Sequence, residues 1–253
     1  MFRPHSDTSQ AVRFSVDRLA AWAPGIESSA DWAAWARGDL APAGDALPPL
    51  RQMPAALRRH AGPIGRLACD VAYRALDGAE DVPIIFCSRY GEAERSVQLL
   101  TDLARTEPLS PTAFSLSVHN AALGLLSIAR RDGANGIAIA AGEASAAHGV
   151  IEACGLLADG APKVLVINAE NVLPEVYRSF EDRERVPYAW AALLAPSDGA
   201  PISLSWAMSD EETSPASTVP PPAALEVLRF LLTADAELVH TAGSHRWRWS
   251  RGG

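Results

Sequence analysis

The stretch GIAIAAGEASAAHGVIEACGLLADGAPKVLVIN, residues 136–168, predicts a strand, a helix and a second strand in direct succession. Residues 136–141 are small and apolar, and residues 163–168 form the continuous apolar run that is typical of a strand buried on both faces. Residues 144–158 between them are helical in composition. A unit of this kind joins parallel strands by a right-handed crossover. We therefore expect an α/β protein.

Helix and strand signals also alternate on both sides of this unit. Further helices are predicted at Asp31–Arg37, Ile64–Leu76, Glu92–Arg105, Val118–Arg131 and Leu225–Leu232. Further strands are predicted at Arg13–Val16, Val82–Cys87, Tyr188–Ala195 and Ile202–Trp206, with Arg246–Ser250 as an edge strand. We expect one domain over residues 1–253, with a flexible acidic connection at residues 209–222.

Composition and charge exclude several classes of partner. The chain has 253 residues, of which 48% are hydrophobic, and a net charge of −8. An acidic chain without a basic tract is a poor nucleic-acid binder. The longest apolar runs hold about ten residues, whereas a bilayer span needs roughly 20. With no signal-peptide pattern at the N-terminus, we expect a cytoplasmic protein that does not insert into membranes.

Residue counts also remove cofactor and metal chemistries. Lys163 is the single lysine, which argues against a phosphate-binding P-loop and against Schiff-base catalysis. Cys69, Cys87 and Cys154 are widely spaced and odd in number, which argues against a disulfide framework or a structural zinc site. We therefore expect neither a cofactor nor a metal.

The turn between the first strand and the helix of the 136–168 unit holds Glu143. Enzymes use such strand-to-helix turns to present a nucleophile, but glutamate is not a usual nucleophile for acyl transfer. The other interpretation is an acid in the first helical turn, which typically stabilises a helix by ~0.3–1 kcal/mol. His119 and His148 are the histidines nearest to such chemistry. Both fit hydrogen-bonded packing residues better than general bases.

A longer motif lies upstream. The run LSPTAFSLSVHNAALG, residues 109–124, resembles the β-ketoacyl synthase-like N-terminal domain of short ketosynthase chain length factors. These proteins accompany ketosynthases in the type II synthesis of aryl polyenes and related pigments. PIIFCSRYGE, residues 83–92, is similar to the strand and turn that precede the motif. WAPG at residues 22–25, followed by Trp32 and Trp35, is similar to the opening of the family.

The resemblance implies a thiolase-like (ketosynthase-like) fold that is truncated to the first half plus a shortened second half. It also places Glu143 where active ketosynthases have a nucleophilic cysteine. A carboxylate cannot form the thioester that chain transfer requires. His240 and His245 lack the context of the catalytic histidines in the second half. The resemblance therefore implies a subunit without condensing activity of its own.

A chain length factor pairs with a β-ketoacyl synthase and limits its acyl tunnel, and the growing chain is carried by an acyl carrier protein. The resemblance makes six residues candidates for the tunnel or interface: Tyr90, Val97, Leu100, Leu116, His119 and Asn120. Val97 and Leu100 have helical i, i+3 spacing, and residues at this spacing are more often part of a core than of a tunnel lining. Two alternatives remain: a malonyl-carrier-protein decarboxylase or other acyl-thioester enzyme using Glu143 or His119, and a scaffold that stabilises another protein.

Overall fold

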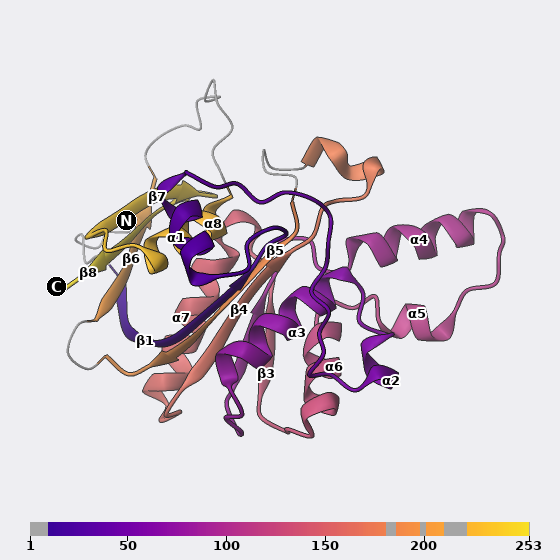
Figure 1. Ribbon diagram of the computed structural model, residues 1–253, viewed down its shortest axis with the longest axis horizontal. Helices are drawn as coiled ribbons and strands as arrows, with labels where there is room; N and C mark the ends of the chain where they lie inside the picture. Colours follow the sequence, from indigo (N-terminus) through magenta and orange to yellow (C-terminus); the bar gives the residue numbers. More distant parts are fainter. Residues whose placement is uncertain (1–9, 181–185, 198–200, 210–221, 253) are drawn as a thin grey trace, which may run out of the picture.

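The computed structural model describes residues 10–180, 186–197, 201–209 and 222–252. Within these ranges, eight strands form one mixed sheet in the order β3-β2-β4-β5-β1-β6-β8-β7 (Figure 1). The strands are β1 (Gln10–Trp22), β2 (Ile84–Cys87), β3 (Gly136–Ile139), β4 (Val164–Glu170), β5 (Tyr188–Ala195), β6 (Ile202–Met208), β7 (Glu237–Ala242) and β8 (His245–Arg251). The α-helices are α1 (Ser29–Arg37), α2 (Ala55–Arg58), α3 (Pro63–Leu76), α4 (Ala93–Ala104), α5 (Pro111–Ser115), α6 (Ala121–Arg130), α7 (Ser145–Ala158) and α8 (Ala223–Leu232).

The predicted strand–helix–strand unit consists of β3, α7 and β4. Its strands are parallel, as predicted, but β2 lies between them and pairs with both. The pairs β4–β5, β5–β1 and those beyond them are antiparallel. The prediction of an α/β architecture is thus confirmed, with an antiparallel extension beyond the parallel strands.

Strand β1 is much longer than the predicted Arg13–Val16. Its 13 residues pair with β6 through the N-terminal half and with β5 through the C-terminal half. The register shifts between Val16 and Arg18, where a bulge interrupts the alternation of buried and exposed side chains. That break in the period of two is why the sequence pattern indicated only part of the strand.

The prediction that Arg246–Ser250 is an edge strand is wrong. The corresponding strand, β8, pairs with β6 on one side and with β7 on the other, so β7 forms the edge. Trp247 and Trp249 are buried on one face of β8. Alternation of apolar and polar residues indicates that one face of a strand is buried. An interior antiparallel strand shows this pattern as well as an edge strand does. Of the connection predicted at 209–222, residues 210–221 lie outside the described residues.

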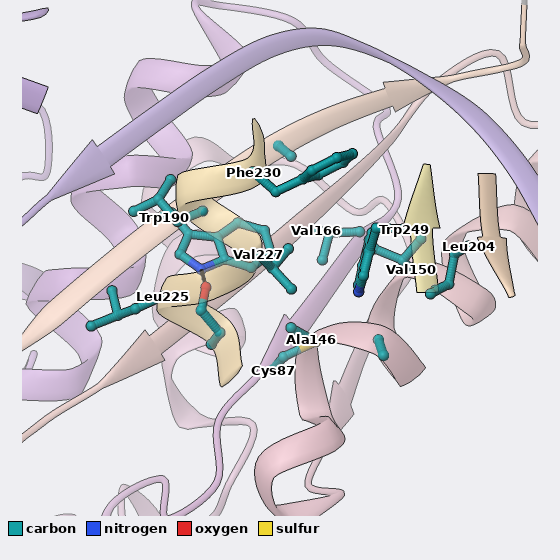
Figure 2. Close-up of a cluster of buried hydrophobic side chains, with 14 of the residues drawn as sticks. Cys87, Ala146, Val150, Val166, Trp190, Leu204, Leu225, Val227, Phe230 and Trp249 are labelled. Atoms are coloured by element: carbon teal, nitrogen blue, oxygen red, sulfur yellow. Dashed lines mark hydrogen bonds between the residues drawn. The ribbon is translucent and has the colours of Figure 1, made fainter. Parts of the chain in front are cut away.

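Each face of the sheet has its own hydrophobic core. Along β2, Ile84 and Phe86 pack with α3 and α6, whereas Ile85 and Cys87 pack with α7. On that second face, α7 and α8 lie against β4 and β5, and they also contact Leu204 of β6 and Trp249 of β8 (Figure 2). The Trp190 Nε1–H donates to the carbonyl of Ala224 at 3.0 Å, which ties β5 to α8.

Helix α7 lies unusually close to the sheet because residue 149 is glycine. A Cβ at Gly149 would be 2.2 Å from the Sγ of Cys87 and 3.4 Å from Val166. A larger residue would push the helix away from β2 and β4. The close packing fixes the first turn of α7 above the carboxyl ends of the parallel strands, where the candidate site lies.

Candidate functional site

The carboxyl ends of β2, β3 and β4 meet at one edge of the sheet, the usual place for a site in parallel α/β structures. Three segments gather there. The turn Ser88–Gly91 follows β2, a 3-10 turn η1 (Gly142–Ala144) follows β3, and Asn168 and Glu170 end β4. A hydrogen bond between Ser88 and Glu170 joins the first and third of these segments, although the two residues are 82 positions apart in the sequence.

Glu143 lies in η1, between the strand and α7. Gly142 before it has a φ of +59°, a left-handed conformation that glycine adopts without strain. The Glu143 side chain is half-exposed, and its Oε1 lies 3.7 Å from Nη2 of Arg89. The strand-to-helix turn was predicted, but Arg89 as the ionic partner of Glu143 was not.

A small cavity lies beside this ion pair. It is lined by Arg89, Gly142, Glu143, Ser145, Asn168, Glu170, Tyr188, Pro222, Ala223 and Ala224, and its volume is about 20 Å³. That volume holds about one water molecule. Ligand pockets are typically about 300–1,000 Å³, so this cavity is too small to hold an acyl thioester.

Glu170 is the most perturbed carboxyl group of the site. Its Oε2 accepts a hydrogen bond from the Ser88 hydroxyl at 3.2 Å, and Oε1 accepts one from the backbone N–H of Arg89. The backbone of Tyr90 also hydrogen-bonds to the Glu170 carboxyl. Burial raises the pKa of Glu170 to about 7, although these donors and the Arg89 guanidinium act in the opposite direction. Sequence reasoning missed this residue, because an isolated glutamate at a strand end carries no motif.

The cysteine at this edge is not an activated nucleophile. Cys87 ends β2 and is fully buried. Burial, and secondarily the nearby Glu170, raises the pKa of its thiol, so the thiol stays protonated. Burial likewise raises the pKa of Cys69 and of Cys154 to about 12. Reactive cysteines have lowered pKa values and access to solvent. The pKa of each of these three thiols is raised instead.

No hydrogen bond or ion pair between described residues links either candidate histidine to Glu143. His119 precedes α6; its Nε2 is 3.3 Å from the Ile139 carbonyl, and its ring centroid is 5.6 Å from that of Phe86. A Cβ at Gly91 would lie 2.5 Å from Nδ1 of His119, so the ring packs directly against the Ser88–Gly91 turn. His148 of α7 is exposed, with Nδ1 3.0 Å from the Ala144 carbonyl. Each ring lies within hydrogen-bonding distance of a backbone carbonyl, and the ring of His119 is also packed, as predicted.

Helices α4 and α5 form an arm, residues 93–118, that projects from the body of the molecule (Figure 1). None of the residues of α4 or α5 is buried. Large apolar side chains on this arm are exposed instead, among them Phe114 at 68% and Leu100 at 58%; the others are Leu103, Leu109 and Val118. An amphipathic helix whose apolar side chains meet solvent is typical of an interaction surface.

The remaining predicted residues lie on or near this arm. Val97 is half-buried on α4, and Leu116 is half-buried just after α5. Asn120 is exposed next to His119. Tyr90 precedes the arm in the Ser88–Gly91 turn and is half-buried. Neither Val97 nor Leu100 belongs to either hydrophobic core, so the core interpretation of these two residues is wrong.

A second exposed apolar group follows β4 and was missed. The 3-10 turn η2 (Glu175–Phe180) exposes Val176, Tyr177 and Phe180. The hydroxyl of Tyr90 donates to the Phe180 carbonyl at 2.6 Å and holds this turn against the site. Figure 1 shows η2 and the arm at the same end of the molecule, away from β7 and β8.

The same half of the molecule has an open sheet edge. Among the described strands, β3 pairs with β2 alone, and its residues Gly136–Ile139 are exposed or half-buried. Parallel strands are normally covered, and an open edge is a template for pairing with another chain.

The family assignment comes from the sequence model of the β-ketoacyl synthase N-terminal domain, which matches residues 32–250. The chain belongs to this family. A search of curated proteins gave no significant match.

Solved structures agree with the family. A chain from the complex of the ketosynthase ApeO with its chain length factor ApeC from Xenorhabdus doucetiae is 30% identical, with a TM-score of 0.83; the match covers 95% of this chain and 100% of that one. The ishigamide ketosynthase/chain length factor is 17% identical, with a TM-score of 0.57 and coverage of 79% and 68%. The module 6 ketosynthase of the bacillaene synthase from Bacillus subtilis 168 is 12% identical, with a TM-score of 0.58.

These likenesses confirm the predicted thiolase-like fold. The match covers 79% of this chain but 42% of the bacillaene ketosynthase chain, in line with the shortened fold that the resemblance implied. None of the described helices is long and apolar enough to cross a membrane.

Proposed function

We propose that this chain is a non-catalytic subunit, similar to a chain length factor, that pairs with a β-ketoacyl synthase. The observation that carries the proposal is the match along the whole length of a chain from the ApeO–ApeC complex. The chemistry of the site agrees with a non-catalytic role. Glu143 stands at the strand-to-helix turn, the cavity beside it is about 20 Å³, and the nearby Cys87 thiol is buried.

The pairing surface in this proposal is the end of the molecule that carries the arm, η2 and the edge of β3. Burying exposed leucine and phenylalanine side chains is worth about 1.5–3 kcal/mol each when the burial is complete. Burial of the five large apolar residues of the arm by a partner would therefore favour association. A partner that also pairs with β3 would cover the unpaired backbone groups of the sheet edge.

At this surface, Val97, Leu100 and Leu116 line the acyl tunnel of the partner and limit the length of its product, while Tyr90, His119 and Asn120 support them. The reaction served is condensation of the type used for aryl polyenes, on chains carried by an acyl carrier protein that reaches the complex through the ketosynthase. Decarboxylation by Glu143 or His119 is disfavoured, because the cavity is too small and no hydrogen bond between described residues links the two side chains.

Co-purification tests the pairing. The chain is expressed alone and with the ketosynthase encoded beside it, and each sample is sized by light scattering. We expect a one-to-one complex for the wild type and for Met208→Asp, a change at a residue that is 66% exposed on β6 at the opposite end. Phe114→Asp on the arm is expected to abolish the complex. A wild-type chain that remains alone in the presence of the ketosynthase would overturn the proposal.

A further inference from the structure

Glu170 connects the interior of the sheet to the proposed pairing surface. It ends β4, and its carboxylate accepts hydrogen bonds from Ser88, Arg89 and Tyr90, three consecutive residues of the turn after β2. Ser88 Oγ in turn accepts from the Gly91 N–H at 2.9 Å, so the turn folds around one carboxylate.

The Ser88–Gly91 turn contacts both η2 and the base of the arm, which are two parts of the proposed pairing surface. Tyr90 holds η2 through its hydroxyl, at 2.6 Å from the Phe180 carbonyl. Gly91 packs against His119, and Glu92, which follows directly, is the N-cap of α4, the first helix of the arm. A shift of the turn therefore moves η2 and the base of the arm together.

Asn168 provides an alternative hydrogen-bond partner for the side chain of Glu170. The two residues lie two positions apart on β4, so their side chains point to the same face of the sheet. Both line the cavity of about 20 Å³. Asn168 is 1% exposed, and its Oδ1 has no hydrogen-bond partner among the described residues. An unpaired buried acceptor favours any donor that can reach it, directly or through one water molecule.

A carboxylate can only accept hydrogen bonds, so it can pair with all three donors of the turn, which are Ser88, Arg89 and Tyr90. A protonated carboxyl group has an O–H that needs an acceptor of its own. The N–H groups of Arg89 and Tyr90 cannot accept, and the Ser88 oxygen already accepts from the Gly91 N–H, whereas Asn168 Oδ1 accepts no hydrogen bond from the described residues. The charge state of Glu170 therefore decides whether the group faces the turn or Asn168.

We propose that Glu170 is a positioning residue for ketosynthase pairing: as a carboxylate it holds the Ser88–Gly91 turn, and when protonated it turns toward Asn168 and releases it. The inference rests on the proposed function. Because burial raises the pKa of Glu170 to about 7, the exchange falls near neutral pH.

Other titratable groups act on Glu170 from the elements around it. Arg89 in the turn favours the carboxylate, while Cys87 of β2 is held neutral by its raised pKa. Glu143 of η1 and Tyr188 of β5 line the same cavity. The lining residues from α7 and α8 are Ser145, Ala223 and Ala224, which carry no charge in this range.

The test measures the dissociation constant of the complex at pH 6 and pH 8. If only the carboxylate form pairs, a pKa of about 7 makes wild-type binding roughly tenfold weaker at pH 6, because the competent fraction falls by that factor. Glu170→Gln is expected to bind more weakly at pH 8 and to lose this pH step. Glu226→Gln is the control and keeps the step, since Glu226 lies on α8 and its pKa is also raised by burial.

A pH step that persists in Glu170→Gln, or its absence from the wild type, overturns the inference. Should Glu170→Gln fail to fold, Ser88→Ala removes one donor of the turn, and its binding at pH 8 must then be weaker than that of the wild type. The backbone amide signals of Arg89 and Tyr90 provide a readout without the partner. They should titrate near pH 7 in the isolated wild-type chain. If no complex forms at any pH, the proposed function fails, and these signals alone decide whether Glu170 holds the turn.

Discussion

Gly149 lies so close to Cys87 that a Cβ built on the glycine would be 2.2 Å from the thiol sulfur. This contact presses α7 onto β2 and sets the height of η1 above the strand ends. The position of Glu143 relative to Arg89 therefore depends on Gly149, which follows Glu143 by six residues and has no side chain.

Gly149→Ala is expected to destabilise the chain. The added methyl group has no space, and overpacking typically costs 1–3 kcal/mol, more than the gain of up to about 1 kcal/mol in helix propensity. Gly155→Ala on the same helix is the control, because a Cβ there would meet nothing within 4 Å. It should be neutral or stabilising. Urea unfolding of both variants measures the difference, and equal midpoints would contradict the close packing of α7.

Leu100 provides a test of the tunnel assignment. Leu100→Phe is expected to shorten the products of the complex and Leu100→Ala to lengthen them, because the side chain is 58% exposed in the isolated chain and free to face the partner. Since α4 has no buried residue, neither change should lower the stability of the chain by more than about 0.5 kcal/mol. Product lengths are read by mass spectrometry, with Met208→Phe as the control. Altered yield with unchanged length would favour the scaffold interpretation instead.

Glu143 is expected to be dispensable for chemistry. The isolated chain should not release carbon dioxide from a malonyl-carrier protein, and Glu143→Ala should leave the turnover of the complex within about twofold of the wild type. The ion pair with Arg89 is partly exposed at 3.7 Å, so its loss should cost at most about 1 kcal/mol. Intact-protein mass spectrometry checks the first expectation. Decarboxylation by the lone wild-type chain that Glu143→Ala abolishes would establish the enzyme alternative.

Local patterns predicted the fold well where one period dominates a segment. The strand of residues 163–168 and the helix of residues 144–158 were found close to the bounds of β4 and α7, since burial on both faces or on one stripe leaves a clear pattern. Strand β7 was missed. Strand β8 was therefore placed at the edge, since the order of strands in a sheet depends on contacts between distant segments. No local pattern reports those contacts.

The candidate site was predictable only in part for a related reason. The strand-to-helix turn at Glu143 is a local motif, and it lies where the sequence placed it. Glu170, Arg89 and Phe180 belong to the same site only because three strand ends meet there. Their roles depend on hydrogen bonds across 81 to 90 residues of sequence, which spacing along the chain does not indicate.

Glu170 also predicts how the stability of the isolated chain depends on pH. Its pKa is about 7 in the folded chain against an ordinary 4.5, so the folded chain holds the proton more tightly than the unfolded chain between these values. The stability that this group contributes is fully present below about pH 4.5 and is lost as the pH rises through about 7. Glu170→Gln lacks this contribution, so its stability relative to the wild type should rise over that interval and then level off.

Urea unfolding of both proteins at intervals between pH 4.5 and pH 8 measures this difference, and a constant difference would contradict the raised pKa. Stability and pairing are expected to respond to pH in opposite directions. The proton that removes a costly buried charge also releases the turn that the partner needs. A wild-type chain whose stability and affinity for the ketosynthase both increase as the pH falls would show that the carboxylate of Glu170 does not hold the pairing surface.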